Sequence, residues 1–164
     1  MELVWATEDL VIAGRPYPGF PILLWDTMDS CVPANAFFRH YLLRGAIGSR
    51  KSWPSTGRAL YDFFSFLQVH DLDWRDVERG EAKSVVGAYR DYSLVECKLT
   101  SSTTRQRLHY VCKFYEYAQQ QGWVSRLPFG YEERTVKRVL GFLAHVDASG
   151  GKAMVNDIMP RKHR

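Results

Sequence analysis

The chain has 164 residues, of which 46% are hydrophobic and 24% are charged, and its formal net charge at pH 7 is +4. This length and composition suit one folded domain with an ordinary core and exclude global disorder. No secretory signal opens the chain, and a charged residue interrupts every apolar run before membrane-spanning length. We therefore expect a cytoplasmic protein with no membrane partner.

The residues that usually hold metals or perform catalysis are scattered. Cys31, Cys97 and Cys112 are odd in number and far apart, without a CxxC pair, which predicts reduced, structural thiols. Cys97 and Cys112 fall within helical patterns, where a small buried side chain is the common case. The five histidines are also dispersed, so we expect no metal site, no cofactor and no independent enzyme activity.

Charge is distributed in blocks along the chain. Residues 32–61 contain five Lys and Arg residues and no acid, and residues 97–130 contain five against Glu116 alone. If the two blocks meet in space, they form a positive face that attracts polyanions. A solvated helix surface is the alternative interpretation of the same pattern.

The amino-terminal region has β-prone character. Residues 3–6 and 10–13 flank a polar turn at 7–9, which predicts a small hairpin. Glycines and prolines then make residues 14–22 a loop or linker.

Two helices are predicted next. The first starts near Pro33 and ends at Gly45 or Gly48, and the second starts near Ser52. The second carries an i, i+3, i+4, i+7 stripe, formed by Leu60, Phe63, Phe64 and Leu67. Residues 71–77, DLDWRDV, predict a single helical turn that closes one edge of the core.

Two more helices follow. Residues 83–97 predict the third, and the fourth starts with a capping box at Thr103 and Gln106 and ends at Gly122. Its apolar stripe consists of Leu108, Val111, Cys112, Tyr115 and Ala118. The aromatic residues of these helices are expected in the core or at its rim rather than as nucleobase platforms; they are Phe63, Phe64, Phe114, Tyr115 and Tyr117. Beyond Pro128, residues 136–143 have the spacing of a short amphipathic helix, and 149–151 predict a flexible joint.

The predicted fold is therefore mainly α, a four-helix bundle with a small N-terminal β-hairpin. We divide the chain into an N-terminal hairpin and linker (1–22), a helical domain (23–131) and a basic linker (132–164). The first turn of the fourth helix combines unpaired backbone amides, hydroxyls and two arginines, which favours phosphate binding. We expect this end to lie beside the amino end of the second helix, forming one cationic surface.

Taken together, several segments resemble the core-binding, SAM-like domain of tyrosine recombinases (phage-type integrases). They are PANAFFRHYLLRGAIGSRKSWPSTGRALYDFFSFLQ, DLDWRDV, and STTRQRLHYVCKFYEYAQQQGW followed by LPF. The resemblance covers roughly residues 20–130 and rests on the order and spacing of these pieces. It implies a domain that closes around duplex DNA together with a catalytic domain.

In that family the second and fourth helices face the DNA, so the resemblance implies DNA-binding roles for eleven residues. Around the second helix these are Arg50, Lys51, Ser52, Ser55, Thr56 and Arg58, and on the fourth they are Ser102, Thr103, Thr104, Arg105 and Arg107. Most should contact phosphate, although Arg105 or Arg107 could instead pair with guanine. Alternatively, Thr103 is only a cap, Lys51 a solvated charge and Arg58 a partner of Asp62.

The family's catalytic residues lie in a second domain on the C-terminal side. The 33 residues after Tyr131 contain no HxxR pair and no later tyrosine, and Tyr131 does not match the nucleophile. We therefore expect this chain to be inert alone, as a fragment of a longer integrase or as a natural short protein. The expected partners are double-stranded DNA and other recombinase protomers on DNA, with a monomer in isolation. A helical protein–protein interaction module is the alternative function.

Overall fold

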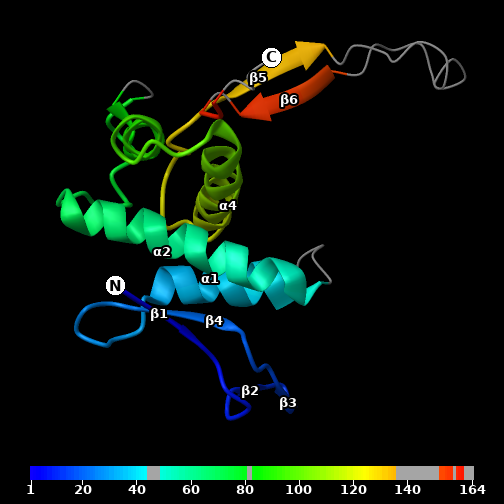
Figure 1. Cartoon of the computed structure of the whole chain (residues 1–164). Coiled ribbons are helices and arrows are strands. Elements are labelled where there is room, and N and C mark those ends of the chain that lie inside the picture. The colour runs from blue at the N-terminus through cyan, green and yellow to red at the C-terminus, as the bar shows by residue number, and fades with distance from the viewer. Residues whose placement is uncertain (44–48, 81–82, 136–151, 157, 161–164) are drawn as a thin grey trace, which may run out of the picture.

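The computed structural model describes residues 1–43, 49–80, 83–135, 152–156 and 158–160. The described part is mainly α-helical, as predicted, and combines four α-helices with short antiparallel strand pairs (Figure 1). The helices are α1 (Val32–Leu43), α2 (Trp53–Val69), α3 (Val85–Asp91) and α4 (Ser101–Gln120). The strands are β1 (Glu2–Trp5), β2 (Val11–Ile12), β3 (Arg15–Pro16), β4 (Pro21–Leu24), β5 (Tyr131–Thr135) and β6 (Lys152–Asn156).

The amino-terminal hairpin is present, but its strands pair differently from the prediction. β1 pairs with β4 in antiparallel register, from Glu2 opposite Leu24 to Trp5 opposite Pro21. β2 pairs instead with β3, across a turn in which Ala13 and Gly14 both have positive φ. Such a two-residue turn matches the twist of a hairpin, so it joins β2 to β3 locally and leaves β1 to pair with β4.

The side chain of Asn35 attaches β4 to α1. Its Oδ1 accepts the Leu23 N–H at 2.8 Å, and its Nδ2 donates to the Leu23 carbonyl at 2.8 Å and to Ser30 Oγ at 2.8 Å. Asn35 is 8% exposed and Leu23 is completely buried. The expected boundary at residue 22 therefore falls inside a strand whose residues belong to the same core as the helices.

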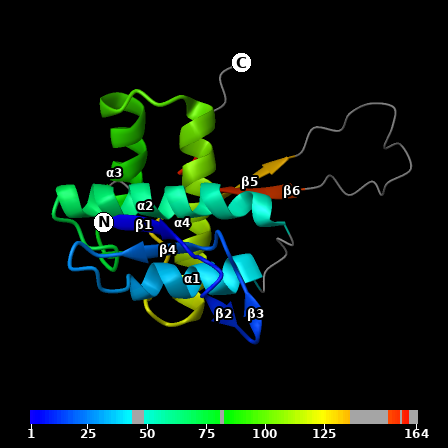
Figure 2. The same cartoon turned by 60° about the horizontal axis from the view of Figure 1, so that its bottom comes forward.

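Helix α2 lies against the β1–β4 sheet at a glycine. A Cβ built on Gly57 would lie 2.8 Å from the Cβ of Pro21, closer than two such carbons can approach. The stripe predicted for this helix is confirmed, because Leu60, Phe63 and Phe64 are each at most 1% exposed. Figures 1 and 2 show α1 alongside α2, whereas α4 crosses α2.

Residues 71–77 form a turn closed by a hydrogen bond from the Asp76 N–H to the Asp73 carbonyl at 3.1 Å. Trp74 and Val77 are 7% and 6% exposed, so the segment does close one edge of the core. The hydroxyl of buried Tyr115 donates to the Trp74 carbonyl at 2.7 Å and fixes the turn on α4.

The third helical segment consists of α3 and a π-helical turn at Tyr92–Glu96, and Ser84 caps it by accepting the Gly87 N–H at 2.9 Å. The capping box predicted for α4 is wrong. Thr100 is the cap, because its Oγ1 accepts the Thr103 N–H at 3.1 Å, and the helix already begins at Ser101, before Thr103. The predicted stop is confirmed, since Gly122 follows α4 with a φ of +75°.

Aromatic side chains fill the core, as predicted. Phe63, Phe64, Phe114 and Tyr115 are each at most 1% exposed and meet edge to face, with ring centroids 5.3–6.0 Å apart in the pairs Phe63–Phe64, Phe63–Tyr115, Phe64–Phe114 and Phe114–Tyr115. These four rings are therefore inaccessible to nucleobases, and Tyr117 is half-buried against the rim of the core.

The cysteines are free thiols, and two of them are buried. Burial raises the pKa of Cys31 to about 11, so its thiol stays protonated. The prediction that Cys97 is buried is wrong. Cys97 is exposed because it follows the last residue of the π-helical turn, where the helical face that would have buried it has ended.

The strand pair β5–β6 was not predicted from the sequence. It is antiparallel, from Tyr131 opposite Asn156 to Thr135 opposite Lys152. After β6, Ile158 is 5% exposed and its carbonyl accepts from the guanidinium of Arg90 at 3.4 Å. The helix predicted at 136–143 and the joint at 149–151 lie outside the described residues.

Candidate nucleic-acid interface

A short cationic turn precedes α2. Residues Arg50–Ser52 form a 3₁₀ turn that Ser49 caps by accepting the Lys51 N–H at 3.2 Å. The Arg50 guanidinium lies 5.2 Å from the ring centroid of buried Trp53. Arg50 and Lys51 are both exposed. Stacking on the indole orders the Arg50 side chain while its N–H groups stay accessible to an anion.

Two of the predicted DNA-contact residues are excluded by burial. Thr56 and Thr104 are completely buried, and each hydroxyl donates to the backbone carbonyl four residues earlier, at 2.7 Å to Ser52 and at 2.9 Å to Thr100. A threonine inside a helix commonly satisfies its hydroxyl in this way. These two positions therefore stabilise the helix starts and cannot contact DNA in this fold.

The remaining predicted residues of α2 are at the surface. Ser52 and Ser55 are half-buried, and Ser55 Oγ lies 3.3 Å from the Tyr110 hydroxyl of α4. Arg58 is exposed, with its guanidinium 5.8 Å from the ring centroid of Trp5 in β1. Its suggested partner, Asp62, pairs instead with Arg107.

The first turns of α4 hold their two arginines on opposite flanks. Residues two positions apart are rotated by about 200° around a helix. Arg107 faces α2, with its Nη1 3.1 Å from Asp62 Oδ2, whereas Arg105 faces the C-terminal segment and donates to the Pro160 carbonyl. Both are half-buried, Ser102 is exposed, and Thr103 is half-buried within the cap. The arginines therefore do not act as one pair.

The amino ends of α2 and α4 are not side by side, contrary to our expectation. Ser55, in the first turn of α2, meets Tyr110, which is nine residues into α4. At 1.5 Å per residue this places the start of α4 roughly 14 Å away along its axis. Figures 1 and 2 show the same separation, because α4 crosses α2 and its amino end stands away from it.

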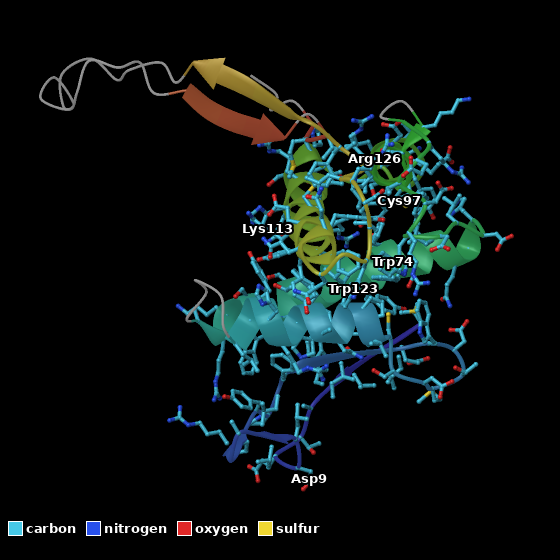
Figure 3. The ribbon with its side chains drawn as sticks, turned by 180° about the vertical axis from the view of Figure 1, so that it is seen from behind. Asp9, Trp74, Cys97, Lys113, Trp123 and Arg126 are labelled. Atoms are coloured by element: carbon cyan, nitrogen blue, oxygen red, sulfur yellow. The ribbon has the colours of Figure 1, made fainter. Side chains whose placement is uncertain are left out.

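A row of polar side chains along α4 was not predicted from the sequence. Ser102, Gln106 and His109 are exposed and Lys113 is partly exposed, at spacings of four, three and four residues, so they lie on the face opposite the apolar stripe. Partial desolvation, and next the charge of Lys113, lower the pKa of His109. Figure 3 shows Lys113 on the side of α4 away from Trp74 and Cys97. The spacing of the stripe could have revealed this face.

Positive charge dominates helices α1, α2 and α4. Helices α1, α2 and α4 and the turn before α2 carry seven Lys and Arg residues, namely Arg39, Arg50, Lys51, Arg58, Arg105, Arg107 and Lys113. The same segments carry two carboxylates, Asp62 and Glu116, and each is paired with a cation of this set. Acids gather instead on the turn after α2, at Asp71, Asp73, Asp76 and Glu78. We call the exposed and half-buried polar residues at the α2 start, together with the polar row of α4, the basic face: Arg50, Lys51, Ser52, Ser55, Ser102, Gln106, His109 and Lys113.

Other chemistry finds little support in the described residues. No group of three or more His, Cys, Asp or Glu side chains among them could hold a metal ion. None of the described helices is both long enough and apolar enough to cross a membrane. Comparison of the chain with protein-family models, with curated proteins and with solved structures gave no match.

Proposed function

We propose that this chain binds double-stranded DNA through the basic face, in the role that the core-binding domain plays in tyrosine recombinases. The observation that supports this most is the charge of α1, α2, α4 and the turn before α2, where seven cations accompany two carboxylates that are already paired. Three of the seven cations, Arg50, Lys51 and Lys113, belong to the basic face. Cations, hydroxyls and amides of this kind position a protein on phosphates. Such a module is not catalytic by itself and acts in recombination through a separate catalytic domain.

The geometry suits contact with both sides of a groove. The start of α2 and the start of α4 are separated by roughly 14 Å along α4, and the major groove of B-DNA is about 12 Å wide. Arg50 and Lys51 can therefore meet one phosphate strand while Ser102, at the start of α4, approaches the other. His109 lies between them along α4, and Lys113 lies about one helical turn beyond the level of the α2 start.

Salt-dependent binding to a random-sequence duplex tests this proposal. We expect affinity to fall steeply as salt rises from about 50 to 200 mM, because phosphate contacts release counterions. The double variant Arg50→Ala/Lys51→Ala should lower the slope of log K against log salt by about 0.9 for each phosphate that the variant no longer neutralises. Lys113→Ala should lower the slope by about 0.9, as expected for the loss of one phosphate contact.

The matched control removes a cation outside the basic face. Arg126 is exposed and pairs with Glu78 at 2.8 Å, so Arg126→Ala changes the net charge equally without touching α2 or α4. It should leave the salt slope unchanged. Absence of duplex binding at low salt, or equal weakening by Arg126→Ala and Lys113→Ala, would show that the basic face is not a DNA site.

A second candidate function, protein interaction, is favoured by a hollow on another side of the molecule. The hollow has a volume of about 400 Å³ and is lined by Val32, Pro33, Trp74, Arg75 and Trp123. Val32 is 61% exposed although apolar, and Figure 3 shows Trp74 and Trp123 close together. Sedimentation of the wild type and of Val32→Glu tests whether this surface joins two copies; a monomer at every concentration would reject self-association.

A further inference from the structure

Three helices meet at a single carboxylate oxygen. Asp62 Oδ2, on α2, lies 3.1 Å from Arg107 Nη1 on α4, and it also accepts a hydrogen bond from the Tyr89 hydroxyl on α3. The side chains of Arg107 and Asp62 are 31% and 39% exposed, whereas Tyr89 is completely buried. The ion pair is thus at the surface, but one of its members is anchored from the interior.

The anchor makes this pair different from an ordinary surface ion pair. Two mobile side chains lose conformational freedom when they pair, which is why exposed pairs contribute little. Here Tyr89 already orders the carboxylate, so Arg107 meets a fixed acceptor. Burial, and next the charge of Asp62, raise the pKa of Tyr89, which keeps its hydroxyl protonated as a donor.

The pair lies at the edge of the basic face. Arg107 is one helical turn from Tyr110, which contacts Ser55 of the basic face, although its side chain is rotated by about 100° around α4 from that of Gln106. A DNA phosphate that reaches this edge meets a guanidinium already paired with an anion of this protein. The phosphate must displace the Asp62 carboxylate from Arg107, and the negative charge of that carboxylate also repels the phosphate.

We propose that Asp62 competes with DNA phosphates for Arg107. This inference rests on the proposed function. Asp62 lowers the affinity for any duplex, because a DNA phosphate that binds Arg107 only replaces the anionic partner that Arg107 already has in Asp62.

Asp62→Asn tests the inference, with binding to a random-sequence duplex measured by fluorescence anisotropy over a range of salt. Asparagine keeps the size of the side chain and can still accept from Tyr89. We expect binding to become about threefold to tenfold tighter and the salt slope to rise by about 0.9, as expected for one added phosphate contact. In the Arg107→Ala background, Asp62→Asn should change the affinity no more than the control variant described next, Asp91→Asn, does.

Asp91→Asn is the matched control. Asp91 pairs with Arg90 at 2.9 Å and is 64% exposed, so this variant removes the same charge outside the basic face. It should change affinity by less than about twofold. Thermal unfolding checks that each variant is folded, and Asp62→Ser replaces Asp62→Asn if the latter is not.

The outcomes separate the two proposals. If the wild type binds and Asp62→Asn matches Asp91→Asn, the role of Asp62 is refuted and the DNA-binding function stands. The same holds if the gain persists without Arg107, since Asp62 would then act only by its charge. If no variant binds duplex at low salt, both proposals are refuted.

Discussion

Replacing Asn35 by alanine should strongly destabilise the protein. The Asn35 amide makes two hydrogen bonds with the backbone of Leu23 and a third with Ser30, all at 2.8 Å. In this way a side chain of α1 satisfies the backbone of β4 much as a neighbouring strand would. Asn35→Ala removes all three bonds and leaves the fold no polar group to replace them at that position.

The expected loss can be estimated bond by bond. The Leu23 N–H would be left without its acceptor at a completely buried residue, which costs about 1–3 kcal/mol. The Leu23 carbonyl still accepts the Cys31 N–H at 2.9 Å, so losing its second donor costs only about 0.5–1.5 kcal/mol. The free energy of unfolding should therefore fall by about 1.5–4.5 kcal/mol, with a fall in Tm of about 2–4 °C per kcal/mol for a domain of this size.

Urea unfolding followed by circular dichroism measures this loss. Ser30→Ala is the control, because it removes only the bond on the exposed side and should cost less than about 1 kcal/mol. Asn35→Asp should be at least as destabilising as Asn35→Ala, because it buries a carboxylate whose second oxygen faces the Leu23 carbonyl. If Asn35→Ala and Ser30→Ala differ by less than about 0.5 kcal/mol, the bridge to Leu23 does not stabilise the fold.

Three further predictions concern single sites. Gly57→Ala should fail to give the gain of about 1 kcal/mol usual for this change in a helix, because the new Cβ would lie 2.8 Å from that of Pro21; a gain in urea unfolding would contradict this close approach. Exposed Cys97 should react with a thiol reagent in the native protein, whereas Cys31, buried and with a pKa of about 11, should react only on unfolding; equal rates by mass spectrometry would refute this burial. Because the pKa of His109 in the folded protein is lowered below 6.5, the unfolded chain binds a proton first as the pH falls. The free energy of unfolding should therefore decrease as the pH is lowered through about 6.5. His109→Gln should flatten that part of the stability profile, and an unchanged profile would assign the dependence to another group.

The helices could be predicted because their apolar spacing reports burial directly. Leu60 and Phe63 in α2, and Leu108 and Tyr115 in α4, were placed in the core by spacing alone, and all four are completely buried. The partners of the strands could not be predicted in the same way. The pairing of β1 with β4 joins residues about twenty positions apart, and it depends on a turn at Gly14 that leaves no periodic signal in β1 itself.

The candidate site was predictable in composition but not in arrangement. Charge blocks in the sequence identified Arg50, Lys51 and the arginines of α4, yet they could not show that Arg105 and Arg107 point to opposite flanks. The acceptors of these arginines, a carboxylate on α2 and a carbonyl after β6, come from distant parts of the chain. Tertiary contacts, which no local pattern encodes, thus decide which cations remain available.

The pairing of β1 with β4 affects how this protein can be trimmed. Leu3 packs on the core and Met1 contacts Gln68 at 3.2 Å, while Phe20 is 2% exposed. A shortened version that starts at residue 23 would strip β4 of its partner and uncover aromatic surface on α2. Such a version should aggregate during expression, and affinity tags are better appended through a spacer before the first strand.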